Sequence, residues 1–138
     1  MRELNISIGV ISQDGGYLLQ LRGNDPKIGA AGKIGAFGGK IEEGETALQA
    51  VCREIAEETS LVPDVARIRH IASYAIESDH KLETVNVNVE AFEISIDKEE
   101  QVSAIDGEVV QISNDKIADM LDLMTPATRH YFEMELGE

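Results

Sequence analysis

Residues 39–61 read GKIEEGETALQAVCREIAEETSL, and they carry most of what the sequence says about fold and function. We predict a helix from Thr46 to about Thr59. At about 100° per residue, four of its side chains fall on one narrow stripe that should face the core. They are Leu48, Cys52, Ile55 and Thr59. Cys52 is therefore interpreted as a small buried apolar residue rather than a nucleophile.

Three glutamates of this helix, Glu54, Glu57 and Glu58, stand at positions i, i+3 and i+4, which places their Cβ atoms about 5–6 Å apart. A solvated acidic face is the ordinary interpretation of such a group. Here, however, small apolar residues project on the same side of the helix. Two carboxylates at about 6 Å repel by about 3 kcal/mol at an effective dielectric constant of about 20. A hard cation such as Mg²⁺ or Mn²⁺ relieves that repulsion, so the group is a candidate metal site.

A basic, glycine-rich segment leads into this acidic helix. Residues 22–40 hold four basic residues and one acidic residue, whereas residues 42–58 hold six acidic residues and one basic residue. Glycine lets backbone N–H groups approach phosphate oxygens closely. The segment has neither the Gly-Lys-Ser/Thr of a P-loop nor the glycine spacing of a dinucleotide fingerprint. We therefore predict a site for a metal-complexed polyphosphate. Its predicted substrate contacts are Arg22, Lys33, Lys40 and Gly39.

The remainder of the chain mixes predicted strands and helices. Strands are predicted over residues 4–10, 17–21, 67–75, 85–91 and 109–112, and a turn at 13–16 joins the first two as a hairpin. Residues 23–39 are expected to form a loop with at most a short strand near Ala36-Phe37. Two more helices are predicted: one is capped by Ser113 or Asn114 and carries Met124, and one starts at Thr125-Pro126 and ends near Leu136. This order predicts an α/β fold, a mixed sheet flanked by helices, in a single domain over residues 1–138.

Residues 39–61 resemble the Nudix box, G-x5-E-x7-R-E-U-x-E-E-x-G-U, in which U is a bulky aliphatic residue. Eight of its nine specified positions match: Gly39, Glu45, Arg53, Glu54, Ile55, Glu57, Glu58 and Leu61. The resemblance implies the Nudix fold, an α/β/α sandwich around a mixed sheet. It also implies an enzyme that hydrolyses the pyrophosphate link of a nucleoside diphosphate joined to another moiety. Its implied cofactor is Mg²⁺, for which Mn²⁺ can substitute.

The resemblance further implies roles for individual residues. The implied metal ligands are Glu54, Glu57, Glu58 and the main-chain carbonyl of Gly38. Arg53 would pair with a glutamate and hold it in place, and Glu45 would support the junction between loop and helix.

A further glutamate from a later loop is often added in the family, and Glu108 is the candidate here, ahead of Glu99 and Glu100. Glu108 would contact the metal or serve as the general base, and Glu54 is the other candidate for the base.

Ser60 stands where the family pattern has glycine. That glycine ends the helix, and a left-handed backbone there suits glycine. We therefore expect Ser60 to adopt the left-handed conformation at a cost of about 1 kcal/mol. The replacement removes no ligand.

The net charge of −14 makes the chain a poor general binder of nucleic acid, and no basic helix or long apolar run suits a membrane. The first residues lack a secretory signal, and the single cysteine forms no internal disulfide, so a cytoplasmic setting is expected.

The expected partner is a small nucleotide derivative: a nucleoside triphosphate, an oxidised nucleotide, a sugar nucleotide or a dinucleoside polyphosphate. The family resemblance is compatible with a homodimer, but the sequence does not show whether this chain forms one. The alternative function is a Nudix-like domain that binds nucleotides without hydrolysis. Such domains usually lose glutamates of the box, whereas this chain keeps them.

Overall fold

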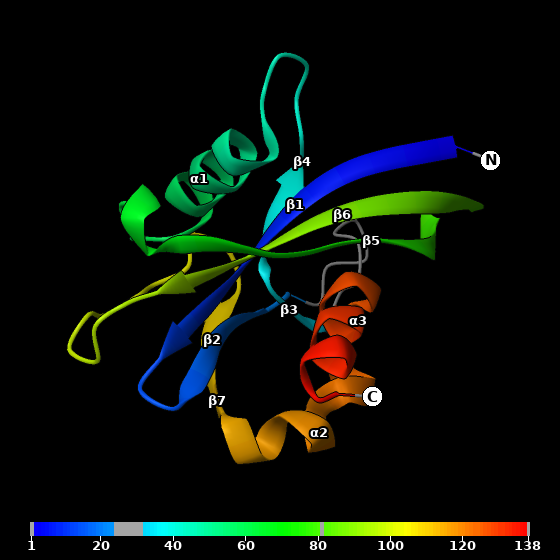
Figure 1. Ribbon diagram of the computed structural model, residues 1–138. Coiled ribbons are helices and arrows are strands. Elements are labelled where there is room, and N and C mark those ends of the chain that lie inside the picture. The colour runs from blue at the N-terminus through cyan, green and yellow to red at the C-terminus, as the bar shows by residue number, and fades with distance from the viewer. Residues whose placement is uncertain (1, 24–31, 81, 138) are drawn as a thin grey trace.

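The computed structural model describes residues 2–23, 32–80 and 82–137, in which a mixed β-sheet carries helices on both faces (Figure 1). Helix α1 (Ala47–Glu58) covers one face. Helix α3 (Pro126–Glu135) covers the other. The predicted α/β sandwich is therefore confirmed, and both of these helices lie where the sequence predicts them.

Seven strands form one sheet in the described part of the chain, in the order β3-β2-β1-β6-β5, with β4 beside β1 and β7 beside β2. The strands are β1 (Arg2–Gln13), β2 (Gly16–Leu21), β3 (Ile34–Gly35), β4 (Phe37–Lys40), β5 (Ile68–His80), β6 (Glu83–Ser95) and β7 (Glu108–Ser113). Each predicted strand is present. The glycine-rich segment, expected to hold at most one short strand, holds two, and its residues 24–31 lie outside the described residues.

Strand β1 organises the sheet because it pairs with three other strands. It runs parallel to β6 from Arg2 to Ser12. Its other edge is shared, because residues Ile6–Gly9 pair with β4 and residues Ile11–Gln13 pair with β2, both antiparallel. This division places β4, and the helix that follows it, beside the middle of β1.

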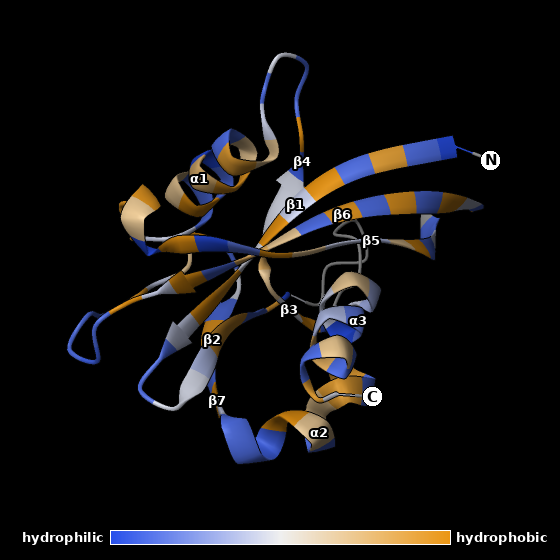
Figure 2. Cartoon of the chain, viewed as in Figure 1, coloured by the Kyte–Doolittle hydropathy of each residue, from blue (hydrophilic) through white to orange (hydrophobic). Residues whose placement is uncertain are grey.

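Hydrophobic and hydrophilic residues alternate along parts of β1 and β6, as the colours in Figure 2 show. Because successive side chains of a strand point to opposite faces of the sheet, the long strands contribute to two hydrophobic cores, one on each face. Val85, Val87 and Val89 belong to the core on the α3 side, together with Tyr131 and Phe132 of α3. The second core lies under α1 and contains Ile11, Phe37, Val51, Ile55, Phe92 and Ile94.

The segment before α3 differs from the prediction of one capped helix. It forms three short helical turns, η2 (Asn114–Lys116), α2 (Ile117–Met120) and η3 (Leu121–Leu123). The Ser113 hydroxyl donates to the Asp115 carboxylate and caps no backbone N–H, so the expected cap is missing. Within the described ranges, no helix is long and apolar enough to cross a membrane.

Helix α1 is turned from its predicted orientation, although two of the four predicted core residues, Ile55 and Thr59, are buried. Its buried residues are Ala50, Val51 and Ile55, whereas Leu48 and Cys52 are only partly buried at the edge of the contact. The helix is thus turned so that the glutamates lie next to the buried face. Gly9 of β1 permits this, since a Cβ there would lie 2.8 Å from Ile94 Cδ1 and 3.0 Å from Val51 Cγ2.

The end of α1 also corrects an expectation. The helix ends at Thr59, which is extended (φ −135°, ψ 172°), and the non-glycine residues with positive φ in the described ranges are Asp14 and Leu82. Ser60 therefore does not take up the expected left-handed conformation. Its N–H donates to the Ser103 carbonyl at 3.0 Å, so a pairing with a distant segment replaces a glycine cap.

The contact at Gly9 predicts that Gly9→Val lowers the free energy of unfolding by about 1–3 kcal/mol, because the added methyl groups overpack the space under α1. Urea titration followed by circular dichroism measures the change. Gly23→Val is the matched control, because a Cβ at Gly23 meets no atom within 4 Å. Equal losses in the two variants would contradict this description of the helix–sheet contact.

Candidate active site

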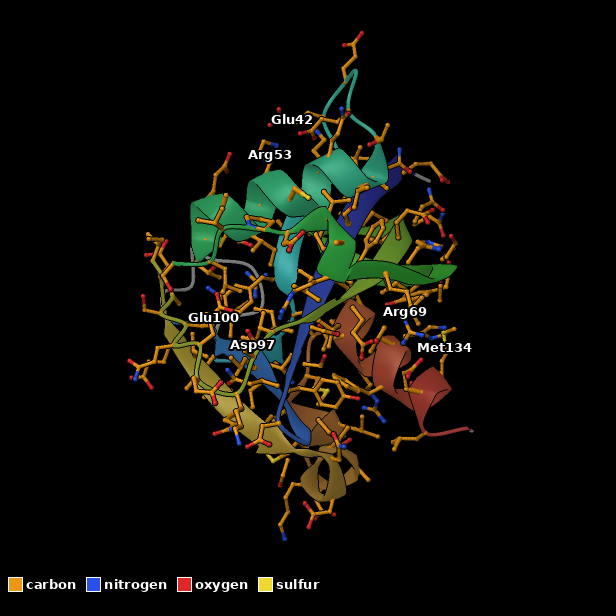
Figure 3. All side chains as sticks on the ribbon, turned by 60° about the vertical axis from the view of Figure 1, so that its left-hand side comes forward. Glu42, Arg53, Arg69, Asp97, Glu100 and Met134 are labelled. Carbon is orange, nitrogen blue, oxygen red and sulfur yellow. The ribbon has the colours of Figure 1, made fainter. Side chains whose placement is uncertain are left out.

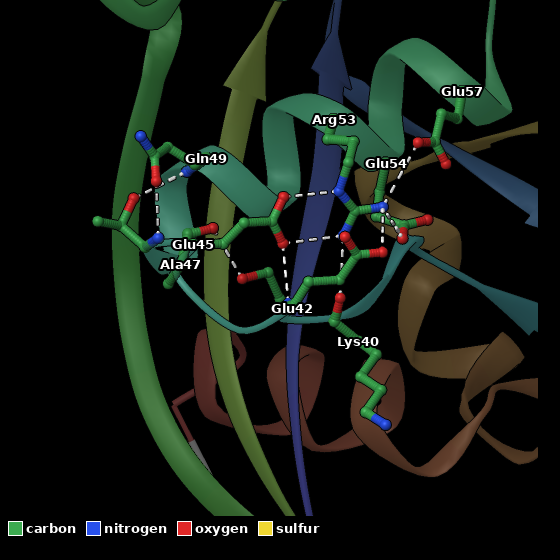
Figure 4. A network of polar contacts seen from close by, with 10 residues as sticks. Lys40, Glu42, Glu45, Ala47, Gln49, Arg53, Glu54 and Glu57 are labelled. Carbon is green, nitrogen blue, oxygen red and sulfur yellow. Dashed lines mark hydrogen bonds and ion pairs between the residues drawn. The ribbon is translucent and has the colours of Figure 1, made fainter.

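The turn before α1 and the first turn of α1 are held by reciprocal hydrogen bonds (Figure 4). The Thr46 hydroxyl accepts from the Gln49 N–H at 3.1 Å, and the Gln49 side chain accepts from the Thr46 N–H at 2.8 Å. This capping box satisfies two N–H groups that the helix start would otherwise leave unpaired. The first turn of α1 is thereby fixed relative to Thr46, the last residue of the turn that leads into it.

Arg53 binds this turn to the middle of the helix. Its Nε and Nη2 donate to the two carboxylate oxygens of Glu45 at 2.6 and 3.0 Å, and Nη2 also donates to the Lys40 carbonyl at 3.0 Å. The remaining nitrogen, Nη1, donates to Glu54 Oε1 at 2.7 Å. Hydrogen bonds from Arg53 lower the pKa of Glu45 to about 2. The planar guanidinium therefore keeps Glu45 ionised and holds both Glu45 and Glu54 in fixed positions.

The three glutamates differ in their surroundings. Glu54 lies against β4, where a Cβ at Gly39 would stand 2.8 Å from its carboxylate carbon. Glu58 Oε1 accepts a hydrogen bond of 2.8 Å from the Gly38 N–H. Glu57 is exposed, with Oε1 3.5 Å from Arg53 Nη1. The carboxylates of Glu54 and Glu58 thus rest on the two glycines of β4.

Glycine is required at position 38. Its φ is +151°, and a side chain there would collide with the Ser7 carbonyl of β1. The Ile41 N–H donates to the Asn5 carbonyl of β1. In an antiparallel pair, the backbone groups of successive residues point alternately toward and away from the partner strand. The backbone N–H and C=O groups of Gly38 and Lys40 therefore point away from β1. The Gly38 carbonyl therefore faces the same side as its N–H, which bonds to Glu58.

Burial raises the pKa of Glu58 to about 7, against the opposing effect of the Gly38 hydrogen bond. The charge of Glu54 raises it further, Arg22 lowers it, and Glu57 raises it again. This carboxyl group thus lies in a place where its negative charge is poorly compensated by the protein's own groups.

The predicted metal ligands are the carboxylates of three glutamates and the Gly38 carbonyl, and oxygen atoms of these kinds suit a hard divalent cation. The negative charge of Glu58, which the protein's own groups compensate only in part, favours a cation as well. Among the described residues, however, no three carboxylate, imidazole or thiol groups converge closely enough to hold a metal ion. Oxygens of Glu54, Glu57 and Glu58 instead face Arg53 or the Gly38 N–H. Metal binding therefore requires these side chains to turn toward one another.

A cavity of about 470 Å³ adjoins β4 on the sheet face away from α1. Leu4, Ile6 and Ile8 of β1 form part of its apolar lining, and Arg22, Gly38, Gly39 and Lys40 line it next to the carboxylates. Four predicted site residues therefore meet at one cavity. Lys33 is not among its lining residues, and its Nζ lies 3.4 Å from the Asp122 carbonyl.

A second cavity, of about 190 Å³, lies on the carboxylate side, and Arg22 lines both cavities. Glu57, Glu58 and Asp106 line it as well. Glu108 begins β7 opposite Leu21, is exposed and is not one of the lining residues. Glu100 lies on the loop after β6, well away from Arg53 in Figure 3, and lines a different cavity with Pro63 and Arg67.

Sequence reasoning missed two parts of this site. Asp106 carries no spacing signal, because it comes from an irregular segment and joins Glu57 and Glu58 at one cavity only in the fold. Thr125 and Thr128, at the start of α3, also line the large cavity. The alternation of Leu4, Ile6 and Ile8 did indicate one half-buried face, and that face proves to be the cavity floor.

The NUDIX domain family matches residues 1–133, so the chain belongs to this family. The resemblance seen in residues 39–61 is therefore confirmed. A curated relative, an ADP-ribose pyrophosphatase from Methanocaldococcus jannaschii, is 42% identical over 65 residues. That match covers 47% of this chain and 37% of the relative, so the chain matches little more than a third of that protein.

Solved structures show the same fold. The NUDIX domain of Shewanella oneidensis NrtR in complex with ADP ribose has a TM-score of 0.72 and 20% identity, covering 99% of this chain and 88% of that chain. A MutT protein from Bacillus halodurans has a TM-score of 0.69 and 19% identity, with 94% and 80% covered.

A third solved structure is a bifunctional NMN adenylyltransferase/ADP ribose pyrophosphatase from Francisella tularensis, complexed with AMP and a Mn ion. It has a TM-score of 0.73 and 18% identity, and the match covers 98% of this chain and 41% of that chain.

The raised pKa of Glu58 predicts how stability depends on pH without divalent metal. The pKa of Glu58 is about 7 in the folded protein, whereas the ordinary pKa of a glutamate side chain is 4.5, so the folded state binds more protons than the unfolded state between these two pH values. The free energy of unfolding contributed by Glu58 therefore falls as pH rises from about 4.5 to about 7.

Urea titrations in EDTA at pH 5 and pH 8 test this, with Glu58→Gln as the comparison. We expect the wild type to lose more stability than the variant between the two pH values. A pH-independent difference between wild type and variant would contradict the raised pKa.

Proposed function

We propose that this protein hydrolyses the pyrophosphate link of a nucleoside diphosphate derivative in a reaction that depends on a divalent metal. One observation carries the proposal: Gly38 and Gly39 support Glu54 and Glu58 and also line the large cavity. If a nucleotide derivative occupied that cavity with its phosphates next to Gly38 and Gly39, only these two glycines would lie between the phosphates and the carboxylates of Glu54 and Glu58. The family and the ADP-ribose pyrophosphatase relative support this class of reaction.

The proposed ligands are Glu54, Glu57, Glu58 and the Gly38 carbonyl, with Glu108 as a further candidate. Mg²⁺ or Mn²⁺ held there would shield phosphate charge and acidify a water molecule for in-line attack on phosphorus. Arg53 orients Glu54. Arg22 lines both cavities, so it can offer positive charge to phosphate oxygens next to the carboxylates.

The attacking water must lose a proton to a nearby carboxylate. Glu54 Oε1 already accepts a hydrogen bond from Arg53 Nη1, so that oxygen is engaged within the protein. Asp106 lines the cavity that Glu57 and Glu58 also line. We therefore propose Asp106 as the first candidate for the proton acceptor and keep Glu108, two residues along the chain, as the second. An acceptor for a metal-bound water is also an outer-shell partner of the metal, so loss of the Asp106 carboxylate would weaken Mg²⁺ binding as well as turnover.

ADP-ribose is the first substrate to test. The relative from M. jannaschii is described as an ADP-ribose pyrophosphatase, and the NUDIX domain of NrtR was solved with ADP ribose. The cavity of about 470 Å³ offers aliphatic residues for a nucleoside and basic residues for phosphates. Nucleoside triphosphates, oxidised nucleotides, sugar nucleotides and dinucleoside polyphosphates complete the panel.

The prediction is Mg²⁺-dependent turnover that falls with the loss of one carboxylate. Glu57→Gln should weaken Mg²⁺ binding at least about 10-fold and lower kcat, because it removes an anionic ligand while keeping the side chain's shape. Steady-state rates measured against Mg²⁺ concentration give both quantities. Glu43→Gln is the control, because Glu43 is exposed in the turn before α1.

Tight nucleotide binding without turnover by the wild type would favour the alternative, a non-catalytic nucleotide-binding domain. Turnover that is equal in Mg²⁺ and in EDTA would contradict the proposed metal dependence. Equal Mg²⁺ requirements in Glu57→Gln and Glu43→Gln would place the metal elsewhere.

A further inference from the structure

We infer that Ser60 is a positioning residue whose hydroxyl fixes residues 103–106 against the end of α1, and thereby holds Asp106 at the cavity lined by Glu57 and Glu58. The inference rests on the proposed function, since it concerns the same site. It assigns a role to the one position at which residues 39–61 depart from the family pattern.

Three consecutive residues at the end of α1 pair with the distant segment. The Ser60 N–H donates to the Ser103 carbonyl at 3.0 Å, and the Ser103 N–H donates to Ser60 Oγ at 2.9 Å. Thr59 forms a bridge with Ala104. The Ile105 N–H donates to the Glu58 carbonyl at 2.9 Å. The segment therefore pairs with the backbone of a residue that carries one of the proposed metal ligands.

Asp106 is held from its other side by β2. Gln20 is 7% exposed, and its side-chain amide donates to the Asp106 carbonyl at 2.8 Å. Gly107, the next residue, has φ +69°, and a side chain there would collide with the Leu21 carbonyl. The backbone at Asp106 is thus fixed between the end of α1 and strand β2, and Asp106 lines the second cavity with Glu57, Glu58 and Arg22.

The Ser60 side chain is what sets this position apart from the family pattern. A glycine can supply the N–H that reaches Ser103, but it has no hydroxyl to accept the N–H of Ser103 in return. Loss of the hydroxyl leaves one N–H of the segment to be satisfied by water. The segment then loosens at its first contact with α1, and Asp106 stands three residues beyond it.

The test is a double-mutant cycle of Ser60→Ala and Asp106→Asn, with Mg²⁺ affinity measured by calorimetry and kcat measured in parallel. We expect each single change to weaken Mg²⁺ binding, Ser60→Ala by about 3–10-fold and Asp106→Asn by about 10–100-fold. In the Asp106→Asn background, Ser60→Ala should have no further effect on either quantity, because no carboxylate remains to be positioned.

Two further measurements separate positioning from general stability. Amide hydrogen exchange in the metal-free protein should become faster at Ser103 and Ile105 in Ser60→Ala, while the core strand β1 keeps its protection. Ser60→Thr keeps a hydroxyl and should restore Mg²⁺ affinity to within about 2-fold of wild type. Ser113→Ala removes an exposed hydroxyl that bonds to Asp115 and should change neither quantity.

The inference would be overturned if the losses in Mg²⁺ affinity caused by Ser60→Ala and by Asp106→Asn multiplied in the double variant. It would also be overturned if Ser60→Ala left the Mg²⁺ affinity unchanged, or left amide exchange at Ser103 and Ile105 unchanged. Failure of the proposed function has a different signature, namely no turnover by the wild type with any nucleotide of the panel. In that case the Mg²⁺ affinities and the amide exchange still decide whether Ser60 positions Asp106.

Discussion

The site depends on the contact between two glycines of β4 and two carboxylates of α1. The Glu54 carboxylate occupies the space that a side chain at position 39 would need, and the Gly38 N–H donates a hydrogen bond to Glu58. Because β4 pairs with the middle of β1, this contact also fixes the distance between α1 and the sheet. A side chain at Gly39 would displace the Glu54 carboxylate, and a side chain at Gly38 would push β4 away from β1.

Electrostatics explains why such a contact suits a metal-binding site better than a purely structural role. Burying a carboxylate is unfavourable unless a positive charge or hydrogen bonds compensate it. Arg53 compensates Glu54 and Glu45, whereas Glu58 has one backbone N–H and the field of Arg22, and its pKa remains raised. A chain with net charge −14 thus concentrates uncompensated negative charge beside a cavity with basic residues. Cation binding would remove that imbalance and bring phosphates to it.

Much of this arrangement is predictable from the sequence because it is local. The helix over residues 47–58, its three glutamates at helical spacing and the glycines just before it are all close in the chain. Alternation predicts β1 and β6 as strands, whereas their parallel pairing with each other is seen only in the fold. Arg53 and Glu45 lie eight residues apart, within reach of one helix and its preceding turn.

Three features were not predictable, for distinct reasons. The direction in which α1 faces the sheet depends on Gly9, whose missing side chain matters only once helix and strand are packed. The end of the helix depends on Ser103, a partner distant in the chain, which replaces the left-handed cap expected at Ser60. Asp106 lines the same cavity as Glu57 and Glu58 only because of the fold, whereas Glu108, the residue suggested by family resemblance, is not among the residues that line it.

We propose that water attacks a phosphorus of a nucleoside diphosphate derivative beside Gly38 and Gly39, and ³¹P NMR of ADP-ribose incubated with the protein and Mg²⁺ in water enriched in oxygen-18 tests this attack directly. We expect cleavage into two phosphomonoesters, with the label in one of them, and no cleavage in EDTA. The proposed hydrolysis would be wrong if ADP-ribose and every other nucleotide of the panel stayed intact and unlabelled.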